Sequence, residues 1–361
     1  MMTSNSIDFS KVEKVLVANL RHHGDVLLSS PVFSILKKRF PHLNIDAYIY
    51  AETFTMLKNH PAISRFYLYD KEIKKKSLFK RWLYELKILL KLRKNSYDMV
   101  INLTEGDRGA IVARISNPLY AIGVDPEGTG MIGKKSIYTH LIKKTQDIKH
   151  TVERHLDALR CIGIHPDEKE KKITFNVPQQ DMQRVDHLVQ GNFVLIHSVS
   201  RWMFKALPSH TIAEVVKYLI NQKIQVVLTA SSMPSEVSYV KEVIKICPDV
   251  VDLSGKTTLI ELGALIKKCM FIVSVDSVPM HIASALKKPT LGIFGPSCDV
   301  KWGPYKNPRS KVISLNIPCR PCFQKGCGGS GLSKCLEKLQ AEKIIKPLSE
   351  MVKESELAKP F

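Results

Sequence analysis

A short segment in the C-terminal half combines small polar residues with a proline where a helix should begin. Asp276 and Ser277 end an apolar run, Pro279 follows, and Met280 and His281 open an apolar helical pattern. Proline is favoured in the first turn of a helix, where free N–H groups and the helix dipole attract anions. The segment therefore predicts a phosphate site, although an ordinary capped helix has the same pattern.

Two basic residues follow another strand-like run in the same half. Arg201 and Lys205 lie four residues apart, shortly after the apolar run at residues 193–197. A pair of cations at the carboxyl end of a strand suits a diphosphate and could stabilise charge that develops on a leaving group. A solvated basic loop is the alternative.

Glu236 and Gly255 follow two further predicted strands. Glu236 comes after the strand that ends at Thr229, where an acid could hold a ribose hydroxyl, although a lone glutamate on a helix is more often solvated. Gly255 follows the strand at residues 251–253. Because ligands of open parallel sheets sit beyond the carboxyl ends of the strands, we expect these loops to border the same cleft as Asp276.

The first half carries one candidate general base. Gly24 and Asp25 follow the first predicted strand and open the first predicted helix. Glycine lets the backbone approach a ligand closely, and a carboxylate facing a cleft could deprotonate an acceptor hydroxyl. The alternative is that Asp25 is only the N-cap of the helix.

Four cysteines gather near the C-terminus: Cys319, Cys322, Cys327 and Cys335. Four thiolates at short spacing could bind zinc tetrahedrally. Their spacing departs from paired CxxC units, so a reduced structural cluster is the alternative, and no residue is assigned as a metal ligand.

The elements that must position these residues alternate between strand-like and amphipathic runs in both halves, which predicts an α/β fold with parallel sheets. We expect an N-terminal Rossmann-like domain at residues 1–177, a linker at 178–191 and a C-terminal Rossmann-like domain at 192–340. A final helix at 341–361 is expected to pack back on the N-terminal domain. Predicted strands lie at 15–20, 45–50, 99–103, 193–197, 225–229, 251–253, 271–275 and 290–294, and predicted helices at 27–40, 209–219, 259–267 and 279–286.

The charge is concentrated in two stretches. Of the net charge of +20, residues 51–100 and 301–361 each hold 12 Lys or Arg against 5 acids. Such patches attract anionic partners, whether nucleic acid, anionic lipid or a phosphorylated substrate. Residues 71–94 could form a membrane-surface or acceptor-facing helix, or an amphipathic helix with one core face. Without a membrane span or a signal peptide, we expect a cytoplasmic protein.

Five segments, in this order, resemble the bacterial lipopolysaccharide heptosyltransferases: residues 15–31, 201–205, 253–257, 276–283 and 294–296. The resemblance covers nearly the whole chain. Residues 319–322, 327–329 and 335–336 further resemble the subgroup that adds the third, branching heptose. This sequence departs from the commoner form at Ser198, where a proline often stands, and at residues 277–279, which replace a threonine-glycine helix start.

The resemblance implies a GT-B fold, in which two Rossmann-like domains face an interdomain cleft, and an enzyme without metal or cofactor. It implies inverting transfer of heptose from ADP-L-glycero-β-D-manno-heptose to a heptose of the lipopolysaccharide inner core. In this comparison Asp25 matches the general base and Lys205 the diphosphate-binding lysine, with Arg201 as its helper. The remaining donor residues are the diphosphate-binding Asp276, Ser277, Met280 and His281, and the nucleoside-binding Glu236 and Gly255.

The acceptor side is assigned from the same resemblance and from the charge. Arg108 resembles a family arginine near the cleft, and the expected acceptor residues are Gly24, Arg108, Lys74, Lys75 and Arg81. A phosphorylated core on an anionic inner leaflet would use this charge, so we expect peripheral association with the cytoplasmic face of the inner membrane.

Other functions remain open at the level of sequence. The transferase that adds the first or second heptose is one, and a sugar-nucleotide epimerase or a non-catalytic nucleotide-binding protein is another. The pI near 9.5 also favours a nucleic-acid binder. The chain lacks a recognisable nucleic-acid-reading motif and a regular aromatic platform, so no nucleic-acid partner is expected.

Overall fold

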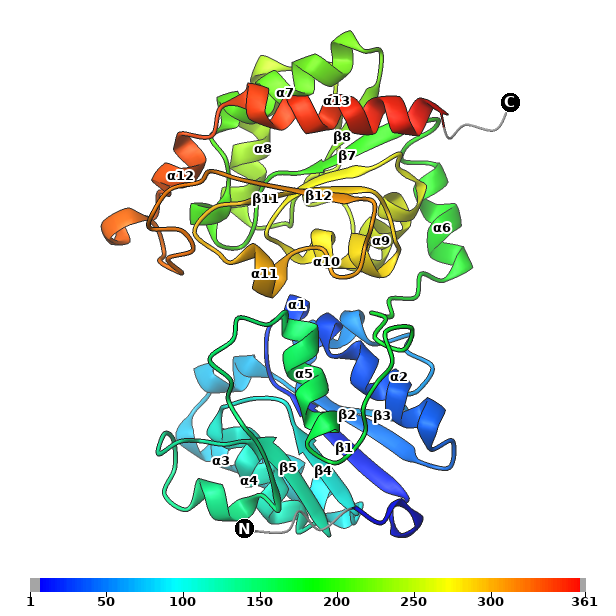
Figure 1. Ribbon diagram of the computed structural model, residues 1–361, viewed down its shortest axis with the longest axis vertical. Coiled ribbons are helices and arrows are strands. Elements are labelled where there is room, and N and C mark those ends of the chain that lie inside the picture. The colour runs from blue at the N-terminus through cyan, green and yellow to red at the C-terminus, as the bar shows by residue number, and fades with distance from the viewer. Residues whose placement is uncertain (1–6, 358–361) are drawn as a thin grey trace. The chain divides into compact units, whose positions relative to one another are not determined.

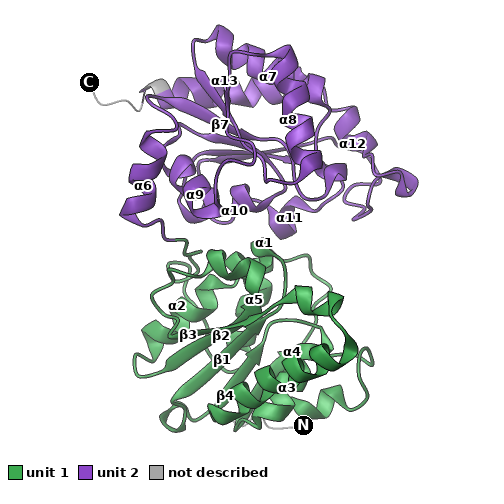
Figure 2. Ribbon diagram, turned by 180° about the vertical axis from the view of Figure 1, so that it is seen from behind, with its two compact units in different colours: residues 1–175 green, residues 176–361 purple. Residues whose placement is uncertain are grey.

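The computed structural model describes residues 7–357, which form two compact α/β units (Figure 2). The chain passes from the first unit to the second between Phe175 and Asn176. Each unit contains one six-stranded sheet in which all neighbouring strands are parallel. Parallel strands need crossover connections, and these are mostly helices here.

The first unit has the strand order β3-β2-β1-β4-β5-β6. Its strands are β1 (Lys14–Asn19), β2 (Asn44–Tyr50), β3 (Arg65–Tyr69), β4 (Met99–Asn102), β5 (Tyr120–Val124) and β6 (His140–Ile142). Its helices are α1 (His23–Leu28), α2 (Ser30–Arg39), α3 (Leu78–Lys94), α4 (Asp107–Ser116) and α5 (Thr151–Arg160). In this unit α1, α2 and α5 pack together, and α3 packs against α4 (Figure 1).

The second unit repeats this topology with the order β12-β11-β10-β7-β8-β9. Its strands are β7 (Phe193–His197), β8 (Gln225–Leu228), β9 (Val251–Asp252), β10 (Ile272–Val275), β11 (Thr290–Phe294) and β12 (Ser310–Ser314). Its longer helices are α6 (Gln179–Asp186), α7 (Ser209–Asn221), α8 (Pro234–Ile246), α9 (Leu259–Lys268), α10 (Val278–Ala285) and α13 (Ala341–Leu357). The short helices α11 (Asp299–Trp302) and α12 (Lys334–Glu337) lie in the loops that precede α13.

Each sheet reverses its strand order at one point. In the first unit this switch lies between β1 and β4, and in the second between β7 and β10. Ligands of doubly wound sheets bind beyond the carboxyl ends of the strands at such a switch point. The loops that follow these four strands are therefore the first places to look for a site.

The cores form because the central strands are mostly apolar and are buried along their whole length. Every residue of β4, β7, β10 and β11 is buried, as expected for parallel strands covered on both faces. In the second unit α7, α8 and α13 contribute to one large apolar cluster with the sheet. Because burial is continuous, the central strands are rigid supports for the loops at their ends.

Two segments form helices that pack within the second unit. Within residues 178–191, predicted as a linker, α6 forms and packs against α9 with Val185 buried. Helix α13 packs on α7 and β12, and its Ile344, Leu348 and Met351 join the core of the second unit; its contact with the N-terminal domain stays a prediction. Residues 358–361 of the predicted final helix lie outside the described residues. Among the helices of residues 7–357, none combines the length and apolar character of a membrane span.

Two buried histidines predict how stability depends on pH. Burial lowers the pKa of His60 and of His197 to about 4, whereas an unfolded histidine titrates near 6.5. As the pH falls from about 6.5 towards 4, protons bind the unfolded chain first, so stability is lost across that window. We expect the free energy of unfolding, measured with urea, to fall by about 1.4 kcal/mol per pH unit for each histidine.

The variant His60→Asn tests whether His60 contributes to this pH dependence of stability. Ala62 donates its N–H to Nδ1 of His60 at 3.2 Å, so Nε2 carries the proton and donates to Oγ of Ser34 at 3.1 Å. Asparagine keeps an acceptor near the Nδ1 position but does not titrate. The slope of unfolding free energy against pH should therefore decrease, and an unchanged slope would contradict the assignment.

Candidate functional site

A lysine and an aspartate meet at the switch point of the second unit. Lys205 ends a short 3₁₀ turn (Met203–Lys205) in the loop after β7, and Asp276 directly follows β10. The Nζ atom of Lys205 lies 2.6 Å from Oδ2 of Asp276. The side chains are 20% and 7% exposed, respectively. A short charged hydrogen bond in a half-buried place fixes the lysine cation beside the start of α10.

The start of α10 offers backbone donors more than side chains. Ser277 is the N-cap residue, but its Oγ donates to the carbonyl of Val275 at 3.2 Å instead of capping the helix. The first helical N–H belongs to Val278, Pro279 has none, and Met280 donates its N–H to the carbonyl of Ser277 at 3.2 Å. The helix therefore begins beside Lys205 without a side-chain cap from Ser277.

Met280 and His281 lie in the first turns of α10 with their side chains in the core. Met280 is fully buried and His281 is 4% exposed. The sulfur of Met280 packs so closely on Gly292 that a Cβ at Gly292 would lie 3.1 Å from it. Contact of these two residues with an anion is therefore restricted to the backbone.

Glu236 and Gly255 border the same loop after β8. Glu236 is 3% exposed, and its Oε2 accepts the N–H of Ser231 at 2.9 Å. Gly255 has a φ of +69° and donates its N–H to the carbonyl of Ala230 at 3.0 Å. A side chain is strained at that φ, so glycine is required for this close approach. The structure thus brings these two residues together, and Glu236 is buried and bonded rather than solvated.

A basic and aromatic rim extends from the loop after β7. The guanidinium carbon of Arg201 lies 5.8 Å from the ring centre of Trp202, and Nζ of Lys325 lies 5.5 Å from the same ring. Ser333 donates its Oγ to the carbonyl of Phe204 at 2.6 Å. The cysteine-bearing loop therefore lies against the loop that carries Lys205 and adds a cation to it.

Arg320 is a residue that the sequence reasoning considered only as part of a cysteine cluster. Its Nε donates to the carbonyl of Gly295 at 2.6 Å, and its NH2 donates to Oδ1 of Asp299 at 3.0 Å. These bonds hold the loop after β11, which also ends at the carboxyl edge of the sheet. The spacing of the neighbouring Cys319 and Cys322 suggested metal binding instead. No sequence pattern indicates that residue 320 contacts residue 295.

The cysteines do not form an evident metal site. Cys319 and Cys327 are exposed, Cys322 is half-buried and Cys335 is buried, and all four are free thiols. Within the described residues, no three His, Cys, Asp or Glu side chains are grouped as metal ligands. Burial raises the pKa of the Cys335 thiol, so it is held in its neutral form.

In the first unit, Asp25 is not the cap of its helix. The N-cap of α1 is His22, and Gly24 and Asp25 lie inside the first turn. Oδ2 of Asp25 lies 3.7 Å from Nε of Arg21, and the Asp25 side chain is 17% exposed. The simple capping role is therefore wrong, because the carboxylate faces a cation and not the orphan N–H groups of the helix start.

Buried His155 on α5 lies within the electrostatic reach of that carboxylate. Burial lowers the pKa of His155, and the negative charge of Asp25 counteracts part of this effect. Helix α5 packs against α1. The sequence could not have found this neighbour, because 130 residues separate the two positions.

Arg108 follows the other switch-point strand, β4, but its charge is already bound. Its NH1 donates to Oε1 of Glu85 at 2.7 Å, and the guanidinium carbon lies 3.9 Å from the ring centre of Tyr69. The hydroxyl of Tyr69 donates to the same Oε1 at 2.6 Å. Arg108 therefore belongs to a closed cluster with α3 and β3.

The three basic residues predicted with Arg108 lie farther along the sheet. Lys74 and Lys75 are in the 3₁₀ turn Lys71–Lys75 after β3, and Arg81 is in α3. All three are exposed, and Nζ of Lys75 lies 2.6 Å from Oε2 of Glu72. Since β2 separates β3 from β1, the fold does not group these cations with Asp25 in the sheet.

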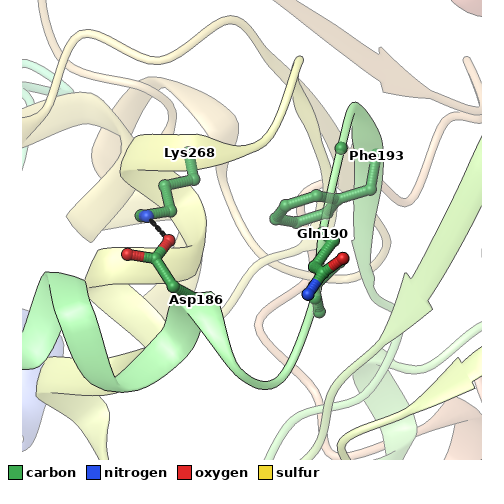
Figure 3. Close-up of a pocket in the computed structure, with 6 residues that line it drawn as sticks. Asp186, Gln190, Phe193 and Lys268 are labelled. Carbon is green, nitrogen blue, oxygen red and sulfur yellow. Dashed lines mark hydrogen bonds and ion pairs between the residues drawn. The ribbon is translucent and has the colours of Figure 1, made fainter.

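The second unit also has a cavity of about 490 Å³ that is not at the switch-point loops. Figure 3 shows Asp186 of α6 and Lys268 of α9 joined by an ion pair, with Gln190 and Phe193 beside them. Phe193 is the first residue of β7, whereas His197 ends that strand. The cavity therefore lies at the amino edge of the sheet, away from the loops where ligands of such folds bind.

Each unit has a parallel sheet with the strand order of Rossmann folds, and in the second unit a cation lies beside a helix start at the switch point. These features are typical of two-domain α/β proteins of the nucleotide-binding class. The model of "Glycosyltransferase family 9 (heptosyltransferase)" matches residues 86–332. Lipopolysaccharide heptosyltransferase 3 of Escherichia coli is 32% identical over 296 residues, covering 80% of this chain and 85% of that protein. The chain therefore belongs to glycosyltransferase family 9, the heptosyltransferases, and is a glycosyltransferase.

Solved structures agree on the fold. The E. coli ADP-heptose LPS heptosyltransferase II has a TM-score of 0.74 at 21% identity, over 95% of this chain and 99% of that one. The E. coli heptosyltransferase WaaC with ADP has a TM-score of 0.74 at 19% identity, over 94% and 99%. The expected GT-B fold and the resemblance to the heptosyltransferases are thus confirmed.

Proposed function

We propose that this enzyme transfers L-glycero-D-manno-heptose from ADP-L-glycero-β-D-manno-heptose to a heptose of the lipopolysaccharide inner core, as its branching heptose. The single observation that carries the donor half is the Lys205–Asp276 pair at 2.6 Å beside the start of α10. The 32% identity to a lipopolysaccharide heptosyltransferase 3 supports the choice of acceptor.

The second unit binds the donor. Lys205, held by Asp276, contacts the diphosphate, and Arg201 adds a second cation from the same loop. The helix start from Ser277 to His281 provides backbone N–H groups, apart from Pro279, which has none, and the positive end of the helix dipole. Glu236 and Gly255, joined through the loop after β8, bind the nucleoside.

The first unit supplies the base. Asp25 takes the proton of the acceptor hydroxyl as the hydroxyl oxygen attacks the anomeric carbon. The bond from that carbon to the diphosphate oxygen breaks, and ADP leaves from the opposite side, so the anomeric centre inverts. Lys205 and Arg201 stabilise the negative charge on ADP, which lets the reaction proceed without a metal ion or cofactor.

The acceptor and the membrane are bound by the basic surface of the first unit. Gly24 lets the acceptor approach Asp25, and Lys74, Lys75 and Arg81 attract the phosphates and acidic sugars of the core. Arg108 meets the acceptor from its cluster with Glu85. We further propose that the enzyme works at the cytoplasmic face of the inner membrane, associated with its anionic leaflet.

Mass spectrometry of the lipopolysaccharide core from a deletion strain tests the function. Loss of one heptose with the main chain intact is the expected result, and restoration by the wild-type gene is the control. A core truncated at its first heptoses would instead assign the enzyme to an earlier step.

Binding measurements with the purified protein distinguish this transferase from a nucleic-acid-binding protein. We expect ADP and ADP-heptose to bind in calorimetry with affinities that added duplex DNA does not change. Competition between DNA and ADP for the protein would contradict the absence of a nucleic-acid partner.

A further inference from the structure

Helix α3 carries an apolar stripe on its exposed side. The stripe consists of Phe79, Trp82, Leu83, Leu86 and Leu90, which are 68%, 59%, 44%, 38% and 55% exposed. Their spacing of i, i+3, i+4, i+7 and i+11 places them on one face of a helix, about 100° wide. Such a face normally marks the side that packs in a core, but here it is exposed.

The same helix has a separate face in the core. Ile88 and Leu92 are 8% and 0% exposed and belong to the apolar cluster of the first unit with Tyr97 and Val100. They lie two positions after Leu86 and Leu90, which turns them to a different side of the helix. The exposed stripe is therefore additional to the packing that holds α3 in the fold.

A row of lysines runs beside the stripe. Lys80, Lys87, Lys91 and Lys94 are all exposed and follow a helical spacing of their own. Residues 71–94 contain ten Lys or Arg against two acids. Both acids are paired, Glu72 with Lys75 and Glu85 with Arg108. An exposed apolar face bordered by uncompensated cations is the pattern of a helix that lies in a membrane interface.

We propose that α3 inserts this stripe into an anionic lipid bilayer, with the helix axis in the membrane plane and the lysine row at the level of the lipid phosphates. Charge complementarity favours an anionic bilayer over a second copy of the chain, because a second copy on the stripe would bring two lysine rows together. This inference rests on the proposed contact with the anionic leaflet. It adds that the apolar side chains of the stripe insert into the bilayer, beyond the attraction between surface cations and anionic lipid.

Co-sedimentation of the full chain with lipid vesicles tests the insertion. The triple variant Phe79→Gln/Trp82→Gln/Leu86→Gln should bind vesicles of phosphatidylcholine and phosphatidylglycerol roughly tenfold or more weakly than the wild type, because less apolar area enters the bilayer. The three side chains are exposed, so the thermal unfolding midpoint should not fall. Binding equal to the wild type would overturn the proposal.

A matched control replaces apolar residues exposed elsewhere in the same unit. Leu119, Ile132 and Ile148 are 54%, 101% and 53% exposed. Their triple replacement by glutamine changes the apolar surface to a similar extent but leaves α3 intact, and it should bind vesicles like the wild type. An equal loss in this control would show that general hydrophobicity and not α3 drives binding.

The lysine charges, the emission of Trp82 and self-association provide three further tests. Lys80→Gln/Lys87→Gln/Lys91→Gln should weaken binding to the anionic vesicles at low salt, with a smaller difference at high salt. Emission of Trp82 should shift to the blue on binding, measured in a Trp202→Phe/Trp302→Phe background. If the stripe variant instead turns a dimer into a monomer in sedimentation equilibrium and leaves vesicle binding unchanged, the stripe is a protein interface and the proposal is wrong.

Transfer to a delipidated core oligosaccharide separates this inference from the proposed function. The stripe variant should keep that activity, because the acceptor then needs no membrane. Failure of the wild type to transfer heptose would contradict the proposed function but leave the vesicle result standing.

Discussion

Replacing Asp25 by asparagine should abolish most turnover and leave donor binding unchanged. Asparagine has the same shape but cannot accept the proton of the acceptor hydroxyl, so we expect kcat to fall by about 10²–10⁴-fold. The proposed donor-binding residues all belong to the second unit, so the affinity for ADP should stay the same. Steady-state transfer to purified core acceptor gives the first quantity, and calorimetry with ADP gives the second.

Arg21 provides the control for this experiment. It lies 3.7 Å from the carboxylate and is 57% exposed, so it is an exposed ion-pair partner of Asp25. Arg21→Gln should change kcat much less than Asp25→Asn does, because exposed pairs contribute at most about 1 kcal/mol. If Asp25→Asn kept its turnover, Asp25 would not be the base. Loss of ADP affinity in the same variant would point to a structural defect instead.

The central strands were predictable because their burial is continuous. β7 and β11 have the predicted bounds, 193–197 and 290–294, and each is buried throughout. The strands β3, β5, β6 and β12 gave no clear signal. In β12 no residue is buried, and in β5 a glycine interrupts the run because the ring of Tyr138 occupies the space beside Gly123. Apolar periodicity detects the centre of a sheet better than its edges.

The candidate site was predictable residue by residue but not as an arrangement. The sequence assigned Lys205 and Asp276 to phosphate binding separately, whereas their contact spans 71 positions. Asp25 is excluded as the cap only by the structure, in which α1 begins at His23 with His22 as its N-cap residue. For Arg108 the sequence predicted contact with an acceptor. It could not show that the guanidinium already bonds to Glu85, because that contact is not visible in the local sequence.

Helix α3 shows why periodicity alone left two alternatives open. The spacing of its apolar residues is the same for a face that packs in a core and for a face that meets another surface. Only the exposure of Phe79 and Trp82, beside the burial of Ile88 and Leu92, separates the two faces. The sequence pattern predicts that a helix has an apolar face, and the three-dimensional structure shows whether that face is buried or exposed.

Replacing Lys205 by methionine should impair both catalysis and stability. Loss of the cation removes the proposed contact to the diphosphate, which strengthens as ADP leaves, so we expect kcat/KM to fall by about 10²–10³-fold. The same change leaves Asp276, which is 7% exposed, without its partner at 2.6 Å. The free energy of unfolding should fall by about 2 kcal/mol, less than the 3–5 kcal/mol of a fully buried pair, because Lys205 is partly exposed.

The double variant Lys205→Met/Asp276→Asn separates these two effects. With the carboxylate neutral, most of the lost stability should return in urea unfolding, because no buried charge remains unpaired. The activity should stay low, since the cation proposed to contact the diphosphate is still absent. Lys311→Met, which breaks an ion pair with Glu350 on the surface of the same unit, is the matched control and should change both quantities little. If the double variant regained activity together with stability, Lys205 would act only by neutralising Asp276, and the diphosphate would have to be bound by other residues.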